Sequence, residues 1–100
     1  MALYRKKPVV IEAFQMTKAQ RMDNSHWPVW LHEAWNKDRD TPGSLQRVDP
    51  SADLPDMLEI HTLEGKHLVS WDDWIICGVE GEIYPCKPSV FAETYEPYYG

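Results

Sequence analysis

The fold of this chain is decided by residues 71–96, which read WDDWIICGVEGEIYPCKPSVFAETYE. The stretch holds two of the five Trp residues, both Cys residues and the densest apolar run in the sequence. Its pattern predicts a strand over residues 73–77, a turn near Gly78 and Gly81, and a second strand over residues 82–86. Pro88 then opens a short helix over residues 88–93, in which Phe91 faces inward.

Upstream, the sequence predicts a second hairpin, with strands over residues 57–61 and 66–70 and with Gly65 at positive φ in the turn. Residues 8–16 have the β-branched content of a strand, and their apolar side chains fall on both faces. We therefore expect this strand in the centre of the sheet. Residues 17–24 are polar and predict a loop or a short helical turn.

The main helix is predicted over residues 27–35. Apolar side chains recur there at spacings of three and four, which places them in one stripe along a helix. Pro28 suits the start of the helix, where its missing N–H is not needed. The stripe consists of Trp27, Trp30, Leu31, Ala34 and Trp35.

Residues 37–56 form a long polar segment with three Pro and five Asp, which we expect to be mobile; a functional loop is the alternative. Residues 1–100 are expected to form a single domain. The order of elements predicts an α+β fold, with a mainly antiparallel, curved sheet of about five strands, one main helix and a short C-terminal helix. A partly open barrel is the close alternative.

Ten basic and sixteen acidic residues give a net charge of −6, which argues against a nucleic-acid partner. Arg5-Lys6-Lys7 is the one basic cluster, and three charges are a weak footprint for phosphates. The apolar run from Val9 is broken at Glu12, so no signal peptide is expected, and no membrane association either. These features predict a soluble, cytoplasmic protein with reduced thiols.

The histidines and the cysteines give no strong signal for a metal or a nucleophile. With a two-residue turn at Glu64-Gly65, Thr62 lies opposite His67, and the imidazoles of His61 and His67 point to opposite faces. The sequence therefore predicts no metal and no cofactor. With a turn at Glu80-Gly81, Cys77 lies opposite Tyr84, which leaves Cys77 and Cys86 on one face as reduced core thiols, roughly 7–8 Å apart.

The acidic residues of the stretch are read as turn residues rather than as a catalytic pair. Asp72 and Asp73 are adjacent and point apart in a strand, and Asp72 tolerates a left-handed backbone. The Trp residues are the one positive functional hint: Trp30 and Trp74 are expected in the core, whereas Trp27, Trp35 and Trp71 line either the core or a binding surface.

Two segments resemble a family of small, uncharacterised bacteriophage and prophage proteins. The first reads YRKKPVVIEAFQ (residues 4–15), and the second contains GVEGEIYPCKP (residues 78–88). The second half also resembles the PGDYG-type family, although Trp71-Asp72 stands where those proteins have Pro-Gly. The resemblance implies a phage-encoded protein that works in the cytoplasm of the bacterial host, and it carries over no catalytic residue.

We therefore hypothesise a non-enzymatic accessory protein that binds a host protein or a small planar or anionic ligand and counters a host defence. Ligand contacts by stacking and cation–π interaction are expected, with a homo-oligomer that shares the site. The alternatives are a small hydrolase that uses Asp72, Asp73 or Glu82 with His67, and a structural virion component. The expected binding residues are Trp27, Trp35, Trp71, Tyr84, Arg5 and Lys87.

Overall fold

The computed structural model describes residues 1–5, 7–48 and 57–99. In chain order these residues form β1 (Glu12–Gln15), α1 (Lys18–Met22), the 3-10 helix η1 (Asn24–His26), α2 (Val29–Trp35), β2 (Leu45–Arg47), β3 (Leu58–Thr62), β4 (Gly65–Val69), β5 (Trp74–Cys77), β6 (Ile83–Cys86) and α3 (Pro88–Thr94).

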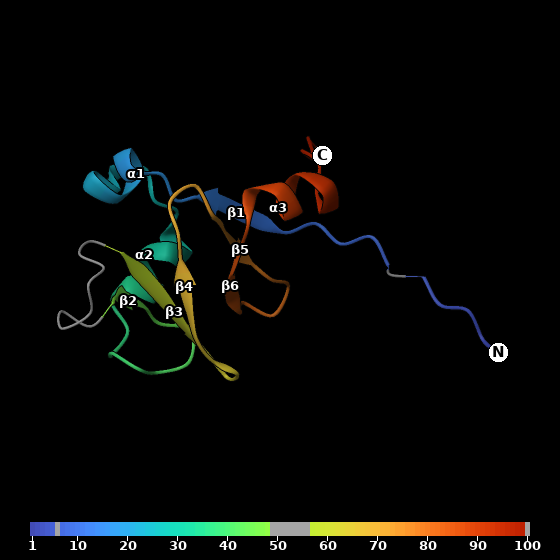
Figure 1. The fold of residues 1–100 in the computed structure, drawn as a ribbon, viewed down its shortest axis with the longest axis horizontal. Helices are drawn as coiled ribbons and strands as arrows, with labels where there is room; N and C mark the ends of the chain where they lie inside the picture. The colour runs from blue at the N-terminus through green and yellow to red at the C-terminus, as the bar shows by residue number, and fades with distance from the viewer. Residues whose placement is uncertain (6, 49–56, 100) are drawn as a thin grey trace.

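The described strands form two three-stranded antiparallel sheets, in the orders β1-β5-β6 and β2-β3-β4 (Figure 1). This confirms the α+β class with antiparallel pairing, and corrects the expected single sheet of about five strands. The chain leaves one sheet after β4 and enters the other at β5, so the two hairpins do not join into one meander. The first strand is also shorter than expected, and it lies at the edge of its sheet rather than in the centre.

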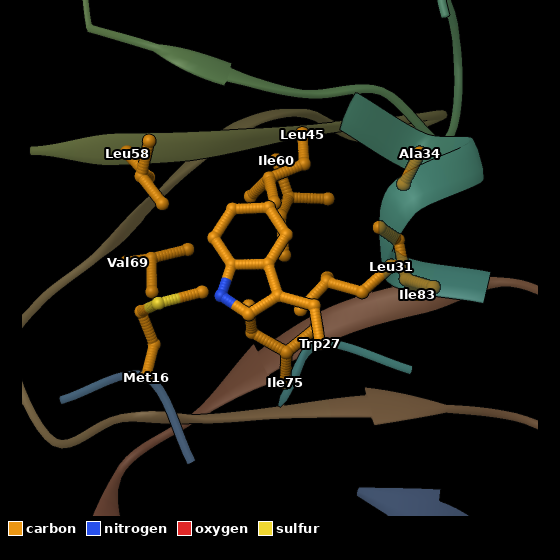
Figure 2. Packing of buried hydrophobic residues seen from close by; sticks show 10 residues of the cluster. All are labelled: Met16, Trp27, Leu31, Ala34, Leu45, Leu58, Ile60, Val69, Ile75 and Ile83. Atoms are coloured by element: carbon orange, nitrogen blue, oxygen red, sulfur yellow. The ribbon is translucent and has the colours of Figure 1, made fainter. Parts of the chain in front are cut away.

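The main core lies between the two sheets and α2 (Figure 2). Leu58 and Ile60 alternate along β3 and so share its inner face. Leu31 and Ala34 lie one helical turn apart on α2 and are both buried. The cluster consists of Met16, Trp27, Leu31, Ala34, Leu45, Leu58, Ile60, Val69, Ile75 and Ile83.

The opposite face of the β1-β5-β6 sheet is covered by α3. The rings of Trp74 and Phe91 stack with centroids 4.1 Å apart and planes within 7°. Tyr95 extends this cluster, with its ring centroid 5.1 Å from that of Phe91. Because side chains alternate along β5, Ile75 faces the main core while Trp74 and the buried Ile76 face α3. The short helix and its inward Phe91 are thus confirmed.

The first hairpin is paired two positions away from the expected register. Thr62 lies opposite Gly65, so Leu63 and Glu64 form the loop, and His67 lies opposite Ile60. Gly65 has φ of 116°, which confirms the expected positive φ at that residue.

The second hairpin differs from the expected register by one position. Cys77 lies opposite Ile83 rather than Tyr84, because the loop holds more than the two residues of a tight turn. The N–H of Gly81 donates to the carbonyl of Gly78 at 3.0 Å, and Gly81 has φ of 84°. A one-residue shift exchanges the faces of every side chain on one strand relative to the other.

The described part of the long polar segment, residues 37–48, contains β2. Ser44, Leu45 and Gln46 are buried there, whereas the expectation that the segment is mobile stays a prediction. The Gln46 amide donates to Asp40 at 2.9 Å and to Glu59 at 2.8 Å. This buried amide ties the segment to β3. Residues 49–56 lie outside the described residues.

The connection from β4 to β5 is a tight turn in which both aspartates have structural roles. Asp72 has φ of 72°, which confirms that it occupies a left-handed position. Asp73 is 2% exposed, and its carboxylate accepts the Ser70 N–H at 2.9 Å and pairs with Lys87 Nζ at 3.2 Å. The N–H of Met16 donates to the Asp73 carbonyl at 2.8 Å, which fixes the end of β1 to the same turn.

Candidate functional site

A groove lies where the tips of the two hairpins approach each other. It has a volume of about 750 Å³ and receives residues from β3, β4 and β6, and from the loops beside them. This volume falls in the range of natural ligand sites, about 300–1,000 Å³. We call it the hairpin groove; it is lined by Lys37, Pro42, Gly43, His61, Thr62, Leu63, Glu64, His67, Glu80, Gly81, Glu82, Ile83, Tyr84 and Pro85.

One wall is the tip of the β3–β4 hairpin. The Thr62 hydroxyl donates to the carbonyl of Gly65 at 3.0 Å and accepts the N–H of Glu64 at 3.1 Å. These two bonds brace the loop while leaving its side chains in solvent, and Leu63 is 91% exposed. The wall therefore presents an apolar and an acidic side chain next to each other.

The other wall is the tip of the β5–β6 hairpin. The Glu82 carboxylate folds back over Gly78, at a place that a Cβ would occupy, and accepts the N–H of Glu80 at 3.0 Å. The N–H of Gly78 donates to the Glu82 carbonyl at 2.8 Å. Glycine at position 78 thus lets this loop close with two glutamates at its tip.

The remaining groove residues come from the chain before β2 and from β3. The N–H of Gly43 donates to the His61 carbonyl at 2.6 Å, and the Lys37 side chain lies over Gly43. Nδ1 of His61 is buried and has no hydrogen-bond partner among the described residues. With neutral histidines, three glutamates against one lysine give the groove a negative charge.

The expected tryptophan site is not assembled as predicted. Trp27 is 6% exposed and lies at the centre of the core, where its indole N–H donates to the Gln20 carbonyl at 2.7 Å (Figure 2). Because its ring faces are covered, it does not line a surface pocket. The rings of Trp35 and Trp27 meet edge to face, with centroids 5.8 Å apart. The Arg21 guanidinium lies over the Trp35 ring, 5.4 Å from its centroid.

The other expected binding residues lie apart from this pair. Trp71 is half-buried, with Lys18 Nζ 6.0 Å from its ring centroid. Lys87 is held by Asp73, and Arg5 lies in an exposed N-terminal segment. Of the six expected residues, Tyr84 is the one that lines the hairpin groove. Burial, and then a hydrogen bond with Tyr95, raise the pKa of Tyr84 to about 12.

The residues of the hydrolase alternative are divided. His67 and Glu82 both line the hairpin groove, whereas Asp72 and Asp73 belong to the β4–β5 turn. Within the described ranges, no three His, Cys, Asp or Glu side chains gather into a group able to hold a metal ion.

The two cysteines are free thiols on opposite faces of their hairpin. Cys77 shares a face with Ile83, while Cys86 lies opposite Trp74 on the α3 side, which corrects the expected shared face. Both are half-buried rather than fully buried. Burial raises the pKa of each thiol, and nearby carboxylates act in the same direction.

Comparison of the chain with protein-family models, curated proteins and solved structures gave no match. The resemblance to small phage proteins therefore stays a prediction. Among the helices of the described part of the chain, none combines the length and apolar content that crossing a membrane requires.

Most groove residues were not expected from the sequence as binding residues. One signal was present, because both hairpin tips carry glutamate next to glycine, at Glu64-Gly65 and at Glu80-Gly81-Glu82. The sequence does not say that these tips meet, since the hairpins belong to different sheets and their contact depends on how the sheets pack.

Proposed function

We propose that this chain is a non-enzymatic phage accessory protein that binds a basic, extended segment of a host protein in the hairpin groove. The protein would act in the bacterial cytoplasm, where binding of the host protein would counter a host defence. The observation that carries it is the placement of Glu64, Glu80 and Glu82 in one open groove, beside the exposed side chain of Leu63.

The charge of the groove favours a host protein over the small anionic ligand that we also considered. Three carboxylates repel an anion, whereas they attract lysine and arginine side chains. The exposed Leu63 side chain beside them can cover the aliphatic stem of such a residue. An extended segment also suits this place because β6 is an edge strand of its sheet.

Structural roles account for two of the three carboxylates that the hydrolase alternative would use, and the third, Asp72, does not line the groove. The Asp73 carboxylate accepts the Ser70 N–H and forms an ion pair with Lys87. The Glu82 carboxylate accepts the N–H of Glu80. Glu64 and Glu80 accept no side-chain hydrogen bond or ion pair among the described residues, and both are exposed to solvent. This division favours binding through the hairpin tips.

The proposal is tested by capturing host proteins from a bacterial lysate on the immobilised chain, with quantitative mass spectrometry. The groove variant Glu64→Lys/Glu80→Lys reverses two charges at the hairpin tips. The control variant Glu93→Lys/Glu96→Lys makes the same change in charge at exposed positions in and just after α3.

We expect proteins that the wild type and the control capture at least tenfold more strongly than the groove variant. Capture of these proteins should weaken as salt is raised, because the contacts lie at the surface. Equal capture by all three proteins would contradict the proposal, and so would the absence of any captured protein.

A further inference from the structure

The N-terminal arm, residues 1–11, is largely exposed: of its described residues, 1–5 and 7–10 lie in solvent and Ile11, next to β1, is half-buried. It runs away from the body of the domain (Figure 1). Most of its apolar side chains are in solvent: Leu3 is 89% exposed, Tyr4 95% and Val10 62%. No hydrogen bond or ion pair of the described residues involves residues 1–5 or 7–10. Apolar side chains exposed in this way are typical of a segment that binds another surface.

The arm and the domain carry opposite charges. Arg5, Lys6 and Lys7 are the charged side chains of the arm, whereas residues 12–100 hold seven basic and all sixteen acidic residues. The arm is thus a basic, extended segment with apolar side chains, which is the kind of segment that the hairpin groove is proposed to bind. We propose that the arm of one copy of this chain occupies the hairpin groove of a second copy, and that two copies exchange arms in this way.

The backbone of β6 offers a short edge to such an arm. Gly78 and Glu82 form a hydrogen-bonded pair, and bonded and non-bonded pairs alternate along an antiparallel ladder. Ile83 and Pro85 therefore turn their backbone groups away from β5. Pro85 has no N–H and Ile83 is 6% exposed, so this edge offers an arm few accessible backbone groups. It does not support a long added strand, and the opposite charges of the arm and the groove carry the proposal.

Exchange between copies also fits the geometry of the arm. Eleven extended residues span about 35 Å, at about 3.3 Å per residue, which is enough to cross to a neighbouring domain. The exchanged arm competes with a host segment for the same groove. Self-association would thus keep the groove filled until a host segment displaces the arm. This inference rests on the proposed function of the groove, and it adds an occupant from the chain itself.

Sedimentation equilibrium of the full chain tests the exchange. The wild type is expected to be a dimer of the 11.7 kDa chain. The arm variant Arg5→Glu/Lys7→Glu and the groove variant Glu64→Lys/Glu80→Lys should each dimerise at least tenfold more weakly. The control Glu93→Lys/Glu96→Lys should match the wild type.

Mixing the arm variant with the groove variant is the decisive step. Each arm then faces a groove of opposite charge in the other protein, so the mixture should recover the dimer. A monomeric wild type would overturn the proposal, as would a dimer that neither variant weakens or a mixture that stays monomeric. Capture of host proteins that depends on the groove remains a separate result, so the arm can fail while the proposed function stands.

Discussion

Replacement of Asp73 tests the physical account of the β4–β5 turn, which carries the chain from one sheet to the other. Asp73 is 2% exposed, and its carboxylate accepts the Ser70 N–H at 2.9 Å. In Asp73→Ala this N–H loses its partner, which costs about 1–3 kcal/mol of unfolding free energy. The ion pair with Lys87 adds at most about 1 kcal/mol, because the Lys87 side chain is 61% exposed.

The matched variants divide this total between its two sources. Asp73→Asn keeps an oxygen that accepts the Ser70 N–H and should lose about 1 kcal/mol or less. Lys87→Met removes the ion pair and the hydrogen bond that Lys87 Nζ donates to the Ser70 hydroxyl at 3.2 Å; because the lysine is 61% exposed, it should also lose about 1 kcal/mol or less. Urea unfolding followed by tryptophan fluorescence gives these values if the slope with urea stays constant. An Asp73→Ala variant as stable as Lys87→Met would refute the reasoning.

Three further predictions follow from burial. The neutral Tyr84 phenol, with its pKa raised from 10 to about 12, contributes stability that is complete below pH 10 and is lost as the pH rises from 10 to about 12. Ultraviolet titration should show a late ionisation that Tyr84→Phe removes; an unchanged curve would contradict the burial of the phenol. Burial raises the pKa of the Cys77 and Cys86 thiols, so iodoacetamide at pH 8 should react more slowly with the folded chain than with the chain in urea, and equal rates would argue against it. Trp27→Phe leaves the Gln20 carbonyl without its donor and should cost about 1–3 kcal/mol in urea unfolding, which a variant as stable as the wild type would contradict.

The sequence predicts the helices and strands better than it predicts which strands pair with one another. Strong local patterns identified both hairpins, the main helix and α3, because apolar spacing and Pro and Gly positions act within a few residues. Strand β2 was missed because its three residues contain one apolar side chain, Leu45, in a polar segment. Its burial comes from pairing with β3, which a local pattern does not reveal.

The registers and the candidate site depend on details that residue types alone leave open. The two glycines of the second hairpin, Gly78 and Gly81, are compatible with several loop lengths. The loop in the structure pairs Cys77 with Ile83, and this register places Cys77 and Cys86 on opposite faces. Trp27 fitted both a core and a surface position because it belongs to a stripe of five apolar residues. Its burial is decided by the packing of both sheets around it, which is a property of the whole chain (Figure 2).

The central claim is that the hairpin groove binds a basic, extended segment. Amide chemical shifts of the isotope-labelled arm variant Arg5→Glu/Lys7→Glu, measured while a peptide of residues 1–11 is added, test it most directly. We predict saturable shifts that concentrate at the two hairpin tips, around Glu64 and Glu80, and that disappear in high salt. Shifts that concentrate around Trp35 and Trp71 instead, or no shifts at all, would contradict the claim.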